Sequence, residues 1–285
     1  MNTAAIGIFD SGLGGLTVAR EIAQLLPAES LLYVGDQARC PYGPRDTLQV
    51  QSYVHQIGSF LANSQAKLIV IACNTATSCA LDIAKQHFDV PVIGVIDAGA
   101  RAALNTTSSG TVAVIGTERT IASGAFPTAI RRLCDQTEVL THATPELAKI
   151  VESGLEDEVA HCEIKRREYY LLVESYLRPL LESNYSQLPD TLLLGCTHYP
   201  VLSQTLQIIA GPGIKVICAA SEVANEVKQV LTNTGQLADQ TKTAQHVFYT
   251  TAENTELFAQ RGAKIFGSEL ATVRHISIDE ICVNL

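Results

Sequence analysis

The sequence predicts an α/β protein made of two similar, open, mostly parallel-sheet domains that face each other across a cleft. Short apolar runs that end in polar turns alternate along the chain with helix-like segments. This is the pattern of βαβ units with right-handed crossovers. The units form two groups of comparable size, and in each group one strand ends in a cysteine-bearing polar turn, at Cys73 and at Cys196.

Composition sets limits on the class of protein. A chain of 285 residues with 47% hydrophobic and 17% charged residues is typical of one large or two medium globular domains. The net charge of −9 argues against direct nucleic-acid binding, which favours a basic surface. No apolar run approaches the ~20 residues of a membrane span. The N-terminus lacks the pattern of a signal peptide, because residues 6–9 already resemble a strand.

The eight cysteines form no CxxC pair and are scattered along the chain. This distribution predicts neither a zinc ribbon nor a disulfide framework. We therefore expect a protein of the reducing cytoplasm, with no bound metal, in which most cysteines are small buried apolar residues.

The first group of units begins at the N-terminus. Its predicted strands are 6–9, 31–34, 68–72 and 90–96, and its predicted helices are 16–26, 46–63, 76–88 and 97–105. The segments before and after each strand are polar or rich in glycine, as expected for buried parallel strands bounded by turns.

The second group begins at residue 111. Its predicted strands are 111–115, 138–141 and 192–194, and its helices are 121–134, 145–152 and 156–182, the last kinked by Pro179. A strand at 215–219, a helix at 221–231, a strand at 246–250 and a final helix and strand over 253–278 resume the pattern of the first group. We therefore expect one domain of residues 1–97 plus 212–285 and another of residues 98–211.

The two cysteine turns are the strongest candidates for a functional site. Each cysteine lies at the carboxyl end of a predicted parallel strand and at the start of the next helix. Ligands of open α/β sheets bind at that edge, and a helix N-terminus favours anions and lowers the pKa of a thiol. Either turn alone could be structural. Together they predict a site with one thiol on each side of a substrate, as inversion at a carbon atom requires.

A glycine-rich turn follows the first strand, Asp10-Ser11-Gly12-Leu13-Gly14-Gly15. It is a weak signal for nucleotide binding, because it is not GxGxxG and has no P-loop lysine. The acidic Asp10 repels phosphate and suits an ammonium group better. Lys67 and Lys85 flank the first cysteine turn, but neither lies at a strand end, so nothing predicts a pyridoxal cofactor.

These residues also carry a family resemblance. The segments GIFDSGLGGLTV (7–18), GDQARCPYG (35–43), ACNTAT (72–77), GCTHYP (195–200) and FYTT (248–251) resemble glutamate racemases in order and spacing. The related aspartate racemases share both cysteine turns but are less similar at the glycine-rich turn and at His198. The resemblance covers nearly the whole chain.

The resemblance implies cofactor-independent racemisation of L-glutamate to D-glutamate for peptidoglycan synthesis, with two thiols as acid and base. It makes Cys73 and Cys196 the two acid/bases and gives assisting roles to Asp10, Asp36, Glu152 and His198. The substrate contacts that it implies are Asp10, Ser11, Tyr42, Gly43, Asn74, Thr75, Thr197 and His198. A homodimer stays open, as do activation by a cell-wall precursor and binding of DNA gyrase, which occur in some family members.

Two features of the sequence are not explained by the roles that the resemblance implies. Cys218-Ala219 stands where many family members have Asp-Ser, a change expected at the cleft floor or hinge. Cys40 lies in the loop before Pro41 without a matching turn, so we do not expect it to be catalytic.

Two other functions stay open at this stage. One is racemisation of aspartate or another acidic amino acid. The other is a binding protein that uses the racemase fold to sequester a partner, which the retention of both cysteines and all the polar turns argues against.

Overall fold

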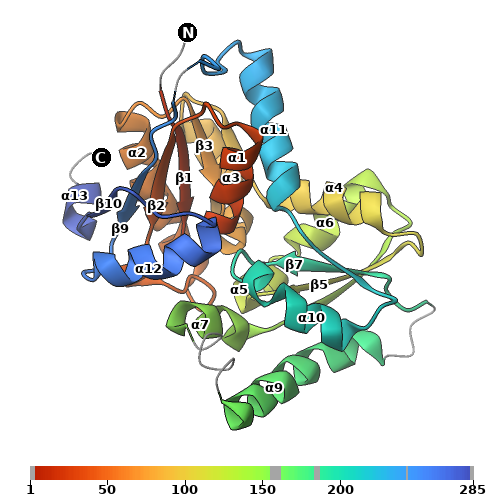
Figure 1. Cartoon of the computed structure of the whole chain (residues 1–285). Helices are drawn as coiled ribbons and strands as arrows, with labels where there is room; N and C mark the ends of the chain where they lie inside the picture. Colours follow the sequence, from red (N-terminus) through yellow and green to blue (C-terminus); the bar gives the residue numbers. More distant parts are fainter. Residues whose placement is uncertain (1–3, 155–161, 183–186, 242, 283–285) are drawn as a thin grey trace.

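Two parallel sheets form the framework of the molecule (Figure 1). The structure is a computed structural model, and it describes residues 4–154, 162–182, 187–241 and 243–282. We call the two halves the first lobe and the second lobe, after the sheet that each contains. All strand pairs in the described residues are parallel.

The sheet of the first lobe has the order β10-β9-β2-β1-β3-β4. Its strands are β1 (Ile6–Asp10), β2 (Leu31–Gly35), β3 (Leu68–Ile71), β4 (Val92–Gly94), β9 (Val247–Thr250) and β10 (Val273–His275). Successive residues of a strand face opposite sides of the sheet. Ile6 and Ile8 accordingly belong to one apolar cluster, and Phe9 belongs to another.

Helices cover both faces of this sheet. The face of Ile8 is covered by α1 (Leu16–Leu25), α11 (Ala220–Asn233) and α12 (Thr255–Phe266), which contribute residues to the same cluster. The face of Phe9 is covered by α2 (Thr47–Asn63), α3 (Asn74–His87) and α13 (Ile278–Cys282). A short helix, η1 (Gln37–Arg39), lies in the loop after β2.

The sheet of the second lobe has the order β6-β5-β7-β8. Its strands are β5 (Thr111–Gly116), β6 (Glu138–Ala143), β7 (Thr191–Gly195) and β8 (Lys215–Cys218). One face packs against α4 (Ile96–Thr106) and α6 (Ala125–Leu133). The other packs against α7 (Pro145–Ser153), α9 (Glu163–Leu181), η2 (Tyr199–Leu202) and α10 (Ser203–Ala210).

The chain crosses between the lobes twice within the described residues. It leaves the first sheet at β4 and enters the second lobe through α4, and it returns between β8 and α11. The second crossing passes through Cys218 and Ala219, the two residues that the resemblance placed at the cleft floor or hinge.

Several sequence-based expectations need correction. The strand at Lys215 was expected in the first domain, but it pairs with β7, so the predicted boundary at residue 212 is wrong for this strand. Its apolar residues gave no sign of which sheet they would join. The helix expected over 121–134 is two helices, α5 (Glu118–Ala122) and α6, because Gly124 has a left-handed φ of +64° that interrupts them.

The long helix expected over 156–182 is described from Glu163 onward as α9, and residues 156–161 lie outside the described part of the chain. Pro179 lies inside the last turn of that helix. In the part of the chain that the structure describes, no helix is both long enough and apolar enough to cross a membrane.

Candidate active site

The carboxyl ends of β1, β3 and β7 bring the polar turns of the two lobes together. Cys73 directly precedes α3 and is its N-cap residue, and Cys196 follows β7. Both thiols are free, and their residues are only 5% and 6% exposed. The two predicted acid/bases therefore lie in equivalent places at the C-terminal edges of two parallel sheets.

Cys73 lies at the N-terminus of α3 and is influenced by the carboxylate of Asp10. Its Sγ is 3.8 Å from the hydroxyl of Ser11, and the backbone N–H of Ala76 is directed at the sulfur. Burial nevertheless raises the pKa of Cys73 well above its ordinary value, and the Asp10 carboxylate and Cys196 raise it further. The Ala76 N–H at the helix N-terminus acts to lower the pKa of this thiol, as expected, but burial outweighs it.

Cys196 begins a chain of contacts that ends at Glu152. His198 Nδ1 lies 3.5 Å from Cys196 Sγ, and His198 Nε2 lies 2.5 Å from Glu152 Oε1. Although burial acts to lower the pKa of His198, Glu152 and Cys196 raise it well above its ordinary value. Burial would likewise raise the pKa of Glu152, but His198 lowers it. The pair is therefore an imidazolium and a carboxylate.

Glu152 is held from both lobes. Its Oε1 accepts a hydrogen bond from the Leu13 N–H at 2.9 Å, and its Oε2 accepts one from the side chain of Gln37. Arg261 of α12 donates to the backbone carbonyls of Glu152 and Ser153, at 2.5 and 2.7 Å. The sequence offered little reason to single out Glu152, yet four contacts fix its position.

Asp10 links the glycine-rich turn to the second cysteine turn. Its carboxylate is fully buried and accepts hydrogen bonds from the Gly12 N–H at 3.0 Å and from the Thr197 hydroxyl at 3.1 Å. Burial raises the pKa of Asp10, while the nearby His198 acts in the opposite direction. A buried carboxylate with few charged neighbours is well placed to receive a cationic group.

The glycine-rich turn allows this close approach. A Cβ atom on Gly14 would lie 2.6 Å from Thr197 Oγ1 and 2.7 Å from His198 Nδ1. A side chain there would collide with the second cysteine turn, so the glycine is needed for contact between the lobes.

Three threonine hydroxyls form a second polar cluster. Thr75 Oγ1 lies 2.9 Å from Thr117 Oγ1 and 3.1 Å from Thr120 Oγ1, and the last two are 3.0 Å apart. Thr117 and Thr120 belong to the second lobe and were missed by sequence reasoning. Their position directly after strand β5, in a turn of the kind that binds ligands, was the available signal.

The loop after β2 contributes the remaining predicted residues. Asp36 is fully buried and accepts hydrogen bonds from Arg39 at 2.6 Å, from Thr251 at 3.1 Å and from the Tyr42 hydroxyl. These contacts hold the loop, and within the described part of the chain no hydrogen bond joins Asp36 to either thiol. Gly43 lies against the second lobe, since a Cβ there would be 2.9 Å from the Cβ of Thr117.

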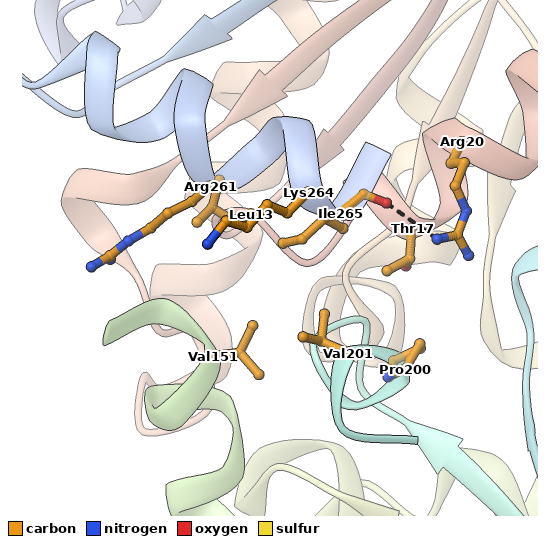
Figure 2. Close-up of a pocket in the computed structure, with 9 residues that line it drawn as sticks. All are labelled: Leu13, Thr17, Arg20, Val151, Pro200, Val201, Arg261, Lys264 and Ile265. Carbon is orange, nitrogen blue, oxygen red and sulfur yellow. Dashed lines mark hydrogen bonds between the residues drawn. The ribbon is translucent and has the colours of Figure 1, made fainter. Parts of the chain in front are cut away.

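Several cavities lie between the lobes, and two of them border the glycine-rich turn or the cysteine turns. One of about 250 Å³ is formed by parts of both lobes (Figure 2) and is lined by Leu13, Thr17, Arg20, Val151, Pro200, Val201, Arg261, Lys264 and Ile265. The other, of about 10 Å³, is lined in part by Asn74, Cys196 and Thr197. The buried Asn74 Oδ1 has no hydrogen-bond partner among the described residues.

Comparison with known proteins identifies the family. Residues 6–227 match the model of the Asp/Glu/Hydantoin racemase family. Two facing parallel sheets with a cysteine turn on each, together with this match, define the class: the chain belongs to the Asp/Glu/hydantoin racemase family and is an isomerase.

Within that family the chain falls among the glutamate racemases. It is 41% identical to the glutamate racemase of Geobacter metallireducens over 276 residues, which cover 96% of this chain and 97% of that protein. A glutamate racemase isoform from Bacillus anthracis has a TM-score of 0.87 and 39% identity, with 96% and 97% of the two chains covered. The glutamate racemase of Francisella tularensis, solved with D-glutamate, has a TM-score of 0.85 and 30% identity over 98% and 99% of the chains. The predicted fold class is confirmed.

Proposed function

We propose that this protein interconverts L- and D-glutamate without a cofactor, by removing the α-proton with one thiol and returning a proton from the other. The observation that carries the proposal is the placement of Cys73 and Cys196 in equivalent buried turns of two facing sheets. The glutamate racemases among its relatives support glutamate as the substrate.

The two thiols serve opposite enantiomers in this mechanism. Cys73 removes the proton of D-glutamate, and Cys196 removes that of L-glutamate, as the resemblance implies. At Cys196, His198 Nδ1 lies 3.5 Å from the sulfur, within reach to exchange a proton with it, and Glu152 orients the imidazole through Nε2. For Cys73, burial raises the pKa of the thiol, while the Ala76 N–H at the start of α3 and the Ser11 hydroxyl act to lower it.

The charged groups of glutamate match two sets of polar residues, one at Asp10 and one at the three threonine hydroxyls. We place the ammonium group at Asp10, whose buried carboxylate has no cationic hydrogen-bond partner in the part of the chain that the structure describes. The side-chain N–H groups of Asn74 and the hydroxyls of Thr75, Thr117 and Thr120 supply donors for the carboxylates. Donors that are already oriented stabilise the charge that develops on the α-carboxylate when the proton leaves.

Deuterium exchange tests the proposal. Purified enzyme in heavy water, without added cofactor, should wash deuterium into the α-position of L-glutamate and produce D-glutamate. Aspartate, run in parallel, decides the closest alternative. Absence of exchange with any acidic amino acid would instead favour a binding protein.

The cellular role follows from the product. D-glutamate made here would serve peptidoglycan synthesis in the cytoplasm, as the resemblance implies. The eight free cysteines support a reducing compartment.

A further inference from the structure

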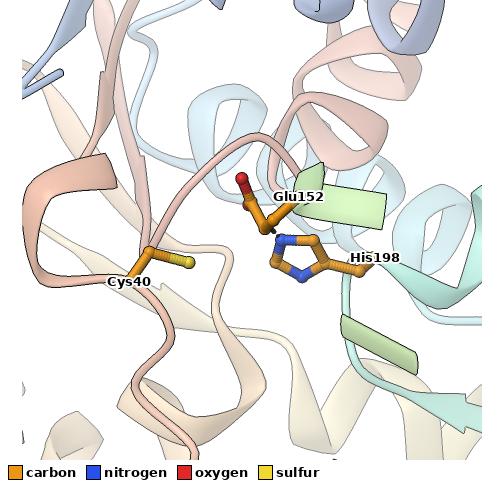
Figure 3. A group of neighbouring side chains, drawn as sticks. All are labelled: Cys40, Glu152 and His198. Atoms are coloured by element: carbon orange, nitrogen blue, oxygen red, sulfur yellow. Dashed lines mark hydrogen bonds and ion pairs between the residues drawn. The ribbon is translucent and has the colours of Figure 1, made fainter. Parts of the chain in front are cut away.

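Cys40 is a thiol that the proposed reaction does not use, yet it points toward two residues of the site (Figure 3). One ligand atom each from Cys40, Glu152 and His198 lies within 4.8 Å of the other two. Cys40 comes from the loop after β2 in the first lobe. Glu152 and His198 come from α7 and from the turn after β7 in the second lobe.

These three donors suit a borderline-soft divalent metal. Thiolate sulfur, imidazole nitrogen and carboxylate oxygen are the donors that Zn²⁺ takes at about 2.0–2.3 Å in tetrahedral sites. Donors at those lengths stand roughly 3–4 Å apart. Small side-chain rotations would therefore convert the present cluster into three corners of a tetrahedron. Mg²⁺ and Ca²⁺ prefer oxygen donors and do not match this set.

The backbone leaves room for the cluster. Gly12 faces it, and a Cβ atom on that residue would lie 2.1 Å from Glu152 Oε1 and 3.2 Å from Cys40 Sγ. The absence of a side chain at Gly12 is what allows Glu152 and Cys40 to approach each other from different lobes.

We propose that Cys40, Glu152 and His198 form an inhibitory site for Zn²⁺ that joins the two lobes. The metal replaces the Glu152–His198 ion pair by binding His198 at Nε2, the nitrogen that faces Glu152. Binding displaces the proton of the Cys40 thiol and the Nε2 proton of His198 into solvent. The imidazolium beside Cys196 is thereby lost, and the lobes are held together.

The inhibition, but not the metal binding, rests on the proposed function. Binding can therefore be measured separately with Co²⁺, which reports a thiolate ligand through a charge-transfer absorption band in the near ultraviolet. Reduced, metal-free enzyme should bind one equivalent of Co²⁺ with that band, and Zn²⁺ should displace it. Zn²⁺ but not Mg²⁺ should inhibit racemisation.

The decisive comparison is between Cys40→Ala and Cys134→Ala. Cys134 is an exposed thiol outside the site, so its replacement should change neither metal binding nor activity. Cys40→Ala should racemise glutamate normally without metal, lose the charge-transfer band and need at least a tenfold higher Zn²⁺ concentration for half inhibition. Cys40→Ser, closer in size, provides the same comparison if Cys40→Ala does not fold.

Two results would overturn the site: no Co²⁺ binding by the wild-type enzyme, or a Cys40 variant that binds and is inhibited like the wild type. The second would assign the metal to the catalytic thiols. A wild-type protein that shows the Cys40-dependent band but does not racemise glutamate would instead overturn the proposed function and leave the metal site standing.

Discussion

At the scale of single residues, the site contains three buried ionisable side chains, of which two form an ion pair. Glu152 and His198 form this pair, and their pKa values move apart because each is the other's counterion. Among the described residues Asp10 forms no ion pair, although His198 acts to lower its pKa, and burial raises that pKa. A site of this kind is short of one positive charge, which the ammonium group of an amino acid supplies.

Replacing either proposed catalytic thiol should leave an enzyme that acts on one enantiomer only. A serine hydroxyl is a far weaker acid than a thiol, so Cys73→Ser or Cys196→Ser should lower racemisation by about 100- to 10,000-fold, the usual contribution of an acid or base. Each variant should still remove the α-proton of the enantiomer that faces its surviving thiol. The assay is elimination from a substrate with a β-leaving group, measured on each enantiomer separately. Equal processing of both enantiomers by both variants would rule out the two-thiol mechanism.

Asp10→Asn should weaken the interaction with substrate without destabilising the fold. Loss of the charge that faces the ammonium should lower kcat/KM about 10- to 100-fold, from a charged hydrogen bond worth ~1.5–3 kcal/mol. Stability should be unchanged or higher, because a buried carboxylate costs free energy that an amide of the same size does not. Steady-state kinetics and denaturant unfolding measure the two effects. Unchanged kinetics would remove Asp10 from the site.

The Glu152–His198 pair should make stability depend on pH. The raised His198 pKa contributes stability that is complete below its ordinary value of 6.5 and is lost as pH rises through the raised value. The lowered Glu152 pKa contributes stability that is complete above its ordinary value of 4.5 and is lost as pH falls through the lowered value.

Glu152→Gln tests this pH dependence. Relative to the wild type, the variant should lose the most unfolding free energy between about pH 4.5 and 6.5. In that range the stabilising contributions of His198 and Glu152 are both complete. Breaking a buried pair costs roughly 3–5 kcal/mol. The deficit should shrink at high pH, and a deficit that does not vary with pH would contradict the ion pair.

At the scale of elements, the site depends on where strands end. The sequence predicted the strands that carry Asp10, Cys73 and Cys196, because apolar runs bounded by polar turns are local signals. It missed Thr117 and Thr120, whose role depends on Thr75 lying 2.9 and 3.1 Å away in the other lobe. It also placed β8 in the wrong sheet. Sheet membership is a long-range property that the strand's own residues do not encode.

The end of α7 offers a test of one such long-range contact. Arg261 of α12 reaches across the lobes to the carbonyls of Glu152 and Ser153, the last residues of α7. Arg261→Met removes these donors, so Glu152 should be less well positioned. We expect kcat to fall about 3- to 10-fold and stability to fall by about 1–2 kcal/mol, as for lost hydrogen bonds from a charged group.

The matched control for Arg261 is Arg178→Met, which removes an exposed arginine from a surface ion pair with Glu174. Such pairs contribute at most about 1 kcal/mol, so kcat should be unchanged. A positioning role also predicts that the pH profile of kcat shifts in Arg261→Met alone. A profile identical to that of the wild type would limit Arg261 to a structural role.

At the scale of the whole molecule, two lobes joined by two chain crossings enclose a site that is closed to substrate. Both thiols are nearly inaccessible, and the cavity that Asn74, Cys196 and Thr197 help to line holds only about 10 Å³. Glutamate is far larger than this space. We therefore expect the lobes to separate to admit substrate, with the chain bending at the crossings β4–α4 and β8–α11.

Alkylation of the thiols by iodoacetamide should report this opening. The exposed Cys134 is an internal control that reacts without any opening, whereas Cys73 and Cys196 should react far more slowly. Saturating D-glutamate should slow both buried thiols by a similar factor, because one bound molecule holds both lobes closed between them, and it should leave Cys134 unaffected. Mass spectrometry of the modified peptides measures all three rates at once. Protection of only one buried thiol would contradict a single site shared by the lobes, and alkylation of both at the rate of Cys134 would contradict a closed resting state.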